Sequence, residues 1–191
     1  MRLNLRARLA TLAVAAFALA ACAGPGAGLA PLPAAGDTGE YRLGPGDQVR
    51  IITFSDEQLT GEFRVSDSGN IAMPLLGPVR AAGLTPGQLE TKVAQQLRQK
   101  NLYKDPSVAV EVVNYRPVFV LGEVNRPGQF PYQPGMTVVT AVAVAGGFTY
   151  RAVEDRASIV RTTDGKAVEG LAQRQSFVRP GDVITIFQRS F

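Results

Sequence analysis

The chain has 191 residues, with 20 Lys and Arg against 16 Asp and Glu, no histidine and one cysteine. Without histidine, and with a single thiol, it cannot form Ser-His or Cys-His nucleophile pairs, histidine-ligated zinc sites or clustered thiolate sites. We therefore predict a protein without catalytic residues, metal ligands or cofactors.

The N-terminal segment is built like a secretory signal. Three arginines precede an apolar run over residues 9–20, which is shorter than the roughly 20 residues that span a bilayer. Leu19–Cys22, with the sequence Leu-Ala-Ala-Cys, resembles a bacterial lipobox. The resemblance implies that residues 1–21 are a cleaved signal peptide and that Cys22 is acylated. An ordinary signal peptide with an unmodified cysteine is the alternative.

Cleavage of the signal peptide would remove most of the net positive charge. The whole chain has a formal charge of +4, and the signal carries three arginines and no acid, so the mature chain is left with +1. This near-neutral charge, without a basic cluster, predicts no nucleic-acid partner. Ala23 stands where an aspartate would, by resemblance, favour inner-membrane retention, so we predict the outer membrane. Residues 22–39, rich in Ala, Gly and Pro, are predicted to be the acylated cysteine and a flexible linker.

Residues 40–115 are predicted to form the first folded body. A Pro45–Gly46 turn opens a strand, and a hairpin at Ser66–Gly69 joins two more. A helix follows, with Thr85 as N-cap, Pro86 first, Gln88 completing a capping box, one apolar stripe, and Asn101 as the stop. The stripe consists of Leu89, Val93 and Leu97, and an alternating strand covers residues 108–113.

Residues 116–191 repeat the strand-helix-strand pattern. A strand over 118–124 is followed by a type II turn at Pro127 and Gly128, and residues 129–132 form the returning strand. Thr137 caps a short helix that Gly146 and Gly147 end. A hairpin turn at Asp164–Gly165 and a last strand over 183–187 complete the pattern. Two strand-rich halves with one helix each predict an α+β fold.

One turn occurs twice. Leu43–Ile51 is matched by Val178–Ile186, and both place Pro-Gly-Asp before a strand. The turn is either a ligand loop or a repeated entry to a strand; we favour the second, since β-branched alternation follows each copy. The predicted shape determinants of the chain are Gly46, Asp47, Gly122, Pro127, Gly128, Gly146 and Gly147.

Other chemical patterns are weak. The adjacent acids Asp56–Glu57 and Glu154–Asp155 would point to opposite faces of a strand, so neither pair forms the facing acid and base of a glycosidase. Gly44–Asp47 lacks the Lys and Ser/Thr of a phosphate-binding loop. We predict that the protein is not an enzyme.

Several motifs together resemble one family. The Tyr-Arg-Leu-Gly-Pro-Gly-Asp opening at Tyr41–Asp47, the Asp67–Ile71 turn, the Gly83–Thr85 helix start and the Asp105–Val108 strand entry resemble outer-membrane polysaccharide export lipoproteins. From Val118 onward the chain resembles their soluble-ligand-binding β-grasp (SLBB) module. The markers are Val120–Val124, Arg126–Gly128 and Ala145–Gly147.

The resemblance implies a small mixed-sheet export domain followed by a β-grasp domain. It implies a homo-oligomeric ring, lipid-anchored at the periplasmic face of the outer membrane, that passes a capsular polysaccharide or exopolysaccharide without catalysis. It also implies an inner-membrane polysaccharide co-polymerase as partner. Larger members end in an amphipathic helix, whereas this sequence stops at Phe191 after a strand. We therefore expect a separate outer-membrane pore protein.

Two points stay open at this level. Arg116 and Arg126 flank the start of the second module and are candidates to contact a neighbouring subunit or the sugar, with a solvated surface role as the alternative. The rival function is a monomeric periplasmic lipoprotein that binds a small soluble ligand through its β-grasp module. A ring in detergent favours the first function, and a monomer with saturable ligand binding favours the second.

Overall fold

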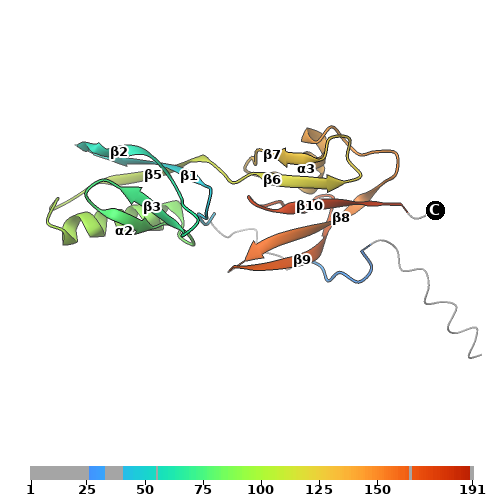
Figure 1. The fold of residues 1–191 in the computed structure, drawn as a ribbon, viewed down its shortest axis with the longest axis horizontal. Helices are drawn as coiled ribbons and strands as arrows, with labels where there is room; N and C mark the ends of the chain where they lie inside the picture. Colours follow the sequence, from blue (N-terminus) through green and yellow to red (C-terminus); the bar gives the residue numbers. More distant parts are fainter. Residues whose placement is uncertain (1–25, 33–40, 55, 164, 190–191) are drawn as a thin grey trace, which may run out of the picture.

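Two separate hydrophobic cores divide the chain into two domains that lie end to end along the long axis of the molecule (Figure 1). The computed structural model describes residues 26–32, 41–54, 56–163 and 165–189. The first domain contains β1 (Gln48–Thr53), β2 (Asp56–Arg64), β3 (Asn70–Met73), β4 (Gly77–Arg80), α2 (Pro86–Gln99) and β5 (Val108–Asn114). The second contains β6 (Val118–Gly122), β7 (Gly128–Phe130), α3 (Val138–Val144), β8 (Ala152–Thr163), β9 (Lys166–Gln173) and β10 (Val183–Gln188). The fold is α+β, as predicted.

The first domain packs one helix against a small sheet. β1 lies at the centre of an antiparallel sheet in the order β2-β1-β5, and β3 pairs separately with β4. The predicted stripe of α2, Leu89, Val93 and Leu97, is fully buried in one core with Val49 and Ile51 of β1. Burial of each such side chain contributes about 1.5–3 kcal/mol, so this stripe holds the helix in place.

The ends of α2 follow the sequence signals. The Thr85 hydroxyl accepts the backbone N–H of Gln88 at 3.2 Å, and the Gln88 side-chain oxygen accepts the N–H of Thr85 at 3.1 Å. These two bonds form the predicted capping box and satisfy donors that the first turn leaves free. Beyond the last helical residue, Asn101 adopts a left-handed conformation with φ 57°. The predicted start and stop are both confirmed.

Thr85→Ala should destabilise the first domain by about 1 kcal/mol, because it leaves an N–H at the start of α2 without its acceptor. Urea unfolding of the full chain, followed by circular dichroism, measures this change. Thr91→Ala is the matched control: Thr91 is exposed within α2 and bonds only the carbonyl of Gly87. Equal loss of stability in both variants would contradict the capping role.

The predicted hairpin around Ser66–Gly69 is wrong in its pairing. The turn closes, with the Gly69 N–H donating to the Ser66 carbonyl at 2.8 Å. However, β2 pairs along its length with β1, and β3 pairs with β4, a Gly-Pro-Val-Arg strand that the sequence did not predict. Pro78 cannot donate to a ladder, so β4 fits a two-stranded edge position that composition alone does not favour.

The second domain has a five-stranded sheet in the order β7-β6-β10-β8-β9. β6 and β10 are parallel neighbours at its centre, and the other pairs are antiparallel. Val120, Ile184 and Ile186 share a core with Val138 and Val142 of α3. The β8–β9 ladder closes at Thr163 and Lys166, which agrees with the predicted two-residue hairpin; Asp164 lies outside the described residues.

Part of the predicted flexible linker is placed against the second domain. The Leu32 N–H donates to the Leu171 carbonyl at 3.0 Å, and the Leu171 N–H donates to the Ala30 carbonyl at 2.8 Å. Residues 30–32 thus pair with β9, the edge strand of the sheet, through one bridge at Pro31. An edge strand offers unpaired backbone groups to any extended segment, so this contact needs no side-chain signal. The description of residues 22–39 as one flexible linker is corrected for 26–32.

No helix among the described residues combines the length and apolar character needed to cross a membrane.

Candidate functional site at the domain boundary

The two Pro-Gly-Asp turns have nearly the same geometry and meet at the domain boundary. In the first, the Gly44 N–H donates to Asp47 Oδ2 at 2.7 Å; in the second, the Arg179 N–H donates to Asp182 Oδ2 at 2.7 Å. The glycine in each turn has a positive φ, 96° for Gly46 and 88° for Gly181. Each turn leads directly into a strand, β1 or β10, which agrees with the predicted strand-entry role.

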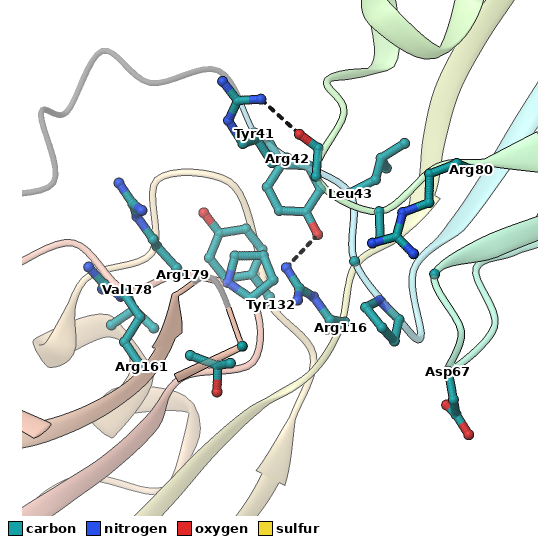
Figure 2. A pocket seen from close by; sticks show the side chains of 18 of the residues that line it. Tyr41, Arg42, Leu43, Asp67, Arg80, Arg116, Tyr132, Arg161, Val178 and Arg179 are labelled. Carbon is teal, nitrogen blue, oxygen red and sulfur yellow. Dashed lines mark hydrogen bonds between the residues drawn. The ribbon is translucent and has the colours of Figure 1, made fainter. Parts of the chain in front are cut away.

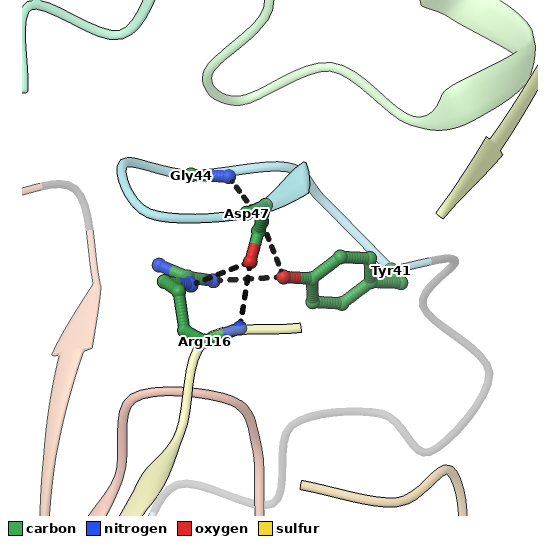
Figure 3. Close-up of polar contacts among 4 residues, drawn as sticks. All are labelled: Tyr41, Gly44, Asp47 and Arg116. Carbon is green, nitrogen blue, oxygen red and sulfur yellow. Dashed lines mark hydrogen bonds and ion pairs between the residues drawn. The ribbon is translucent and has the colours of Figure 1, made fainter. Parts of the chain in front are cut away.

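Asp47 connects the first domain to the segment between the domains (Figure 3). Its side chain has no exposed surface, and it accepts the Tyr41 hydroxyl at 2.5 Å and the Arg116 N–H at 2.9 Å. The Arg116 Nε lies 3.4 Å from Asp47 Oδ1. A carboxylate has two oxygens that each accept several donors, so Asp47 is fully partnered at this position.

Gly44 makes this arrangement possible. A Cβ at residue 44 would lie 2.4 Å from Arg116 Nη1, so the guanidinium occupies space that only glycine leaves free. The sequence analysis named Gly46 and Asp47 in this turn but not Gly44, because the need appears only when Arg116 returns from a distant part of the chain.

Asp182 has an equivalent partner in the second domain. Arg161 on β8 donates from Nε at 3.0 Å and from Nη2 at 2.7 Å to its two carboxylate oxygens. Asp182 is 1% exposed, and the Arg161 side chain is 11% exposed. Such bidentate pairs fix both position and orientation.

Together the two turns hold the connecting segment from both sides. Asp47 accepts the Arg116 N–H, and the Gly181 N–H donates to the Pro117 carbonyl at 3.0 Å. Tyr115 packs edge-on against Tyr41 of the first domain, with ring centroids 5.0 Å apart, and against Tyr132 of the second, 5.4 Å apart. The boundary is therefore a set of specific contacts.

Burial changes the chemistry of Tyr41. Desolvation, and then the hydrogen bond to Asp47, raise the pKa of the Tyr41 hydroxyl well above its ordinary value. The hydroxyl therefore stays protonated and continues to donate to Asp47 throughout the physiological range.

A cleft of about 900 Å³ opens between the two domains beside these turns (Figure 2). Its wall is strongly basic and partly aromatic. The arginines that line it are Arg42, Arg80, Arg116, Arg161 and Arg179, and the aromatic residues are Tyr41, Tyr132 and Phe177. Asp67 is the one acidic residue among the described residues of the lining. This cleft is the candidate functional site.

Of the predicted site residues, Asp47, Gly46 and Arg116 lie at the boundary. Arg116 does not face solvent freely: its side chain is 28% exposed and pairs with Asp47 within the same chain. Arg126 lies elsewhere, where its Nη2 donates to the Val144 carbonyl at 3.1 Å at the end of α3. Cys22 lies outside the described residues.

The remaining predicted residues shape the second domain. Gly146 and Gly147 end α3 with φ of 84° and 88°, and the Gly147 N–H donates to the Val142 carbonyl at 2.9 Å. Gly122 ends β6 with φ 81°. A Cβ on Gly122 would lie 2.1 Å from the Ile186 carbonyl oxygen, so the backbones of β6 and β10 approach too closely for any side chain.

The predicted type II turn at Pro127–Gly128 is wrong. Gly128 has φ 159°, far from the value of about +80° that the turn requires, and it is the first residue of β7, opposite Val120. Pro127 is exposed just before this strand. The bend forms earlier: the N–H groups of Asn125 and Arg126 donate to the carbonyls of Gly147 and Ala145. A Cβ on Gly128 meets no atom within 4 Å, so Gly128→Val would clash with no neighbouring residue, and its cost would come from the backbone conformation at φ 159°.

Sequence comparison assigns the two domains to known families. Residues 35–113 match the model of polysaccharide biosynthesis/export proteins, and residues 117–172 match the SLBB domain. The chain belongs to the family of polysaccharide export proteins, which are transport proteins rather than enzymes.

Several curated proteins are similar to this chain in sequence. The exopolysaccharide production protein ExoF of Rhizobium meliloti is 34% identical over 140 residues, which cover 68% of this chain and 32% of ExoF. The EPS I polysaccharide export outer membrane protein EpsA of Ralstonia nicotianae is 27% identical, covering 78% of this chain and 48% of EpsA. The polysialic acid transport protein KpsD of Escherichia coli is 29% identical over 111 residues, which cover 56% of this chain and 20% of KpsD. The chain thus spans less than half the length of each of these relatives.

Proposed function

We propose that this protein is a lipid-anchored subunit of a ring that conducts an exopolysaccharide or capsular polysaccharide through the periplasm to the outer membrane. The observation that carries the proposal is the match of the chain to an export domain followed by an SLBB domain. Relatives that share this region are named as polysaccharide export or transport proteins, among them an outer membrane export protein.

The anchor is supported by sequence. Leu19–Cys22 follows a short apolar run and three arginines, and Cys22 is the one cysteine of the chain. A thioether-linked diacylglycerol on Cys22 would hold the protein at the membrane, since each buried methylene contributes about 0.8 kcal/mol.

The ring is supported by a free edge of the second sheet. Among the described residues, β7 has a single neighbour, β6, whereas residues 30–32 cover the opposite edge at β9. One open edge and one covered edge favour a heterologous contact, in which a subunit joins different surfaces of its two neighbours. Repetition of such a contact closes a ring when the rotation allows it.

The cargo and the partner follow from the export role. A hydrated sugar chain that slides through a passage needs many weak polar contacts and no catalytic group. The polymer would be supplied by an inner-membrane polysaccharide co-polymerase that meets the ring from the periplasmic side.

Deletion of the gene should abolish surface polysaccharide and leave polymer in the periplasm. Wild-type protein should restore the surface polymer, and Cys22→Ser should not, because the subunit would no longer be held at the membrane. Incorporation of labelled palmitate into the wild type, and not into Cys22→Ser, checks the anchor directly. Ser107→Ala, at an exposed position, is the control that should restore export fully.

Two results would contradict the proposal. Unchanged surface polymer in the deletion strain, without a second copy of the gene, would remove the export role. A strict monomer in detergent by native mass spectrometry would remove the ring and leave the periplasmic ligand-binding lipoprotein as the better account.

A further inference from the structure

We propose that the cleft between the two domains binds an anionic sugar unit, with a sugar carboxylate held between the arginines of the two domains. As a statement about the exported polymer, this assignment rests on the proposed function. It names the substrate class that the cleft is built to take.

The arginines come from five separate segments and line one cleft (Figure 2). Arg42 and Arg80 belong to the first domain, Arg161 and Arg179 to the second, and Arg116 to the segment between them. Five guanidinium groups face one exposed carboxylate, Asp67, among the described lining residues. Concentration of one charge sign in a cleft attracts a ligand of the opposite sign.

These arginines divide into two groups. Arg116 and Arg161 are already paired with the buried carboxylates Asp47 and Asp182, so they supply fixed N–H donors to the cleft without net charge. They are held in place whether or not a ligand is bound. A ligand that contacts these two guanidinium groups does not have to order them, so binding loses no further side-chain entropy there.

The other three have no carboxylate partner among the described residues. Arg42 and Arg80 each donate one N–H to a backbone carbonyl, of Gly83 and Ser68 respectively, at 2.7 Å. Each keeps further N–H groups free, and the exposed Arg179 side chain adds more. A guanidinium presents five donors in a planar fork that matches a carboxylate, which is the geometry this ligand requires.

The aromatic residues favour a sugar over a bare ion. Tyr41, Tyr132 and Phe177 line the same cleft, and Phe177 is 52% exposed. Aromatic rings offer an apolar face to the C–H groups of a pyranose, and pockets for organic ligands combine such faces with a few polar groups. A site for inorganic phosphate alone would have no use for these rings.

The test uses the full chain in detergent and three probes in an isothermal titration. Trigalacturonate supplies carboxylates, maltotriose is a neutral sugar of equal length, and inorganic phosphate supplies an anion without a sugar. We expect saturable binding of trigalacturonate and none of maltotriose. Arg42→Gln with Arg179→Gln should weaken trigalacturonate binding at least about tenfold, since two charge-assisted contacts are lost.

Arg98→Gln is the matched control, because it removes one positive charge from the exposed side of α2, outside the cleft lining. It should bind trigalacturonate like the wild type. Circular dichroism of the double variant should match the wild type, because Arg42 and Arg179 have no buried partner. Equal binding of maltotriose, tighter binding of phosphate than of trigalacturonate, or equal loss in Arg98→Gln would each overturn the proposal.

The outcomes separate this inference from the export role. If gene deletion abolishes surface polymer but trigalacturonate does not bind, the cleft assignment is wrong and the export function stands. If trigalacturonate binds in an arginine-dependent manner but deletion leaves surface polymer unchanged, the export function is wrong and the cleft is a site for an anionic sugar from another source.

Discussion

Gly122→Ala should destabilise the second domain by about 4 kcal/mol or more, enough to prevent stable folding of a marginal domain. The new Cβ would lie 2.1 Å from the Ile186 carbonyl oxygen, which is backbone and cannot rotate away. Relief of the contact would separate β6 from β10, the parallel pair at the centre of the sheet. Urea unfolding followed by circular dichroism measures the loss.

The matched control for this change is Gly135→Ala. Gly135 has φ 82°, almost equal to the 81° of Gly122, but a Cβ there meets no atom within 4 Å. Gly135→Ala should therefore cost only the left-handed backbone strain, about 1–2 kcal/mol. The difference between the two variants isolates the close approach of the strands. Equal effects would show that the approach at Ile186 is not required.

Asp47→Asn should cost about 3–5 kcal/mol and loosen the contact between the domains. The amide would present an NH₂ group to donors that now meet a carboxylate oxygen, and the partly buried Arg116 would lose its counter-charge. We expect a lower urea midpoint and faster protease cleavage within residues 114–117. Without the Asp47 contacts, Tyr115 and Arg116 keep only their contacts with Tyr41 on the side of the first domain.

Glu62→Gln is the control for the loss of a carboxylate. Glu62 pairs with Arg50 at 2.7 Å, but both side chains are largely exposed, so the change should cost less than about 1 kcal/mol. An Asp47→Asn protein as stable as Glu62→Gln, with unchanged cleavage between the domains, would show that Asp47 does not hold the boundary.

Features determined within one element were predicted well from the sequence. The cap of α2 depends on Thr85 and Gln88, three residues apart, and its buried face on a four-residue spacing. Gly146 and Gly147 end α3 through their own backbone conformation. In each case the physical cause lies in residues that are close in the sequence, so the local sequence pattern was enough to predict the feature.

Features that depend on distant backbone were not predicted. The pairing of β3 with β4, and of residues 30–32 with β9, uses N–H and C=O groups that every residue has. The prediction of a type II turn was wrong for a related reason. Residues 125 and 126 form backbone hydrogen bonds with the end of α3, and Gly128 is left extended. Local turn propensity is weaker than these tertiary contacts.

The candidate site was predicted only in part. The repeated Pro-Gly-Asp pattern identified Asp47 and Asp182 as turn residues, and Arg116 was named because it begins the second module. Arg116 bonds Asp47 across 69 positions of sequence, and Arg161 bonds Asp182 across 21. No local signal marks such pairs, so the ion pairs that support the cleft became visible only in the fold.

If Cys22 is acylated, the contact of residues 30–32 with β9 would limit the height of the protein above the membrane surface. Gly26 lies against Leu171 and Phe187, and Cys22 is four residues earlier in the chain. Four extended residues reach at most about 14 Å, whereas a linker free from 22 to 39 would reach roughly 60 Å. With an acylated Cys22, the second domain would therefore stand close to the lipid headgroups and the first would project away from them.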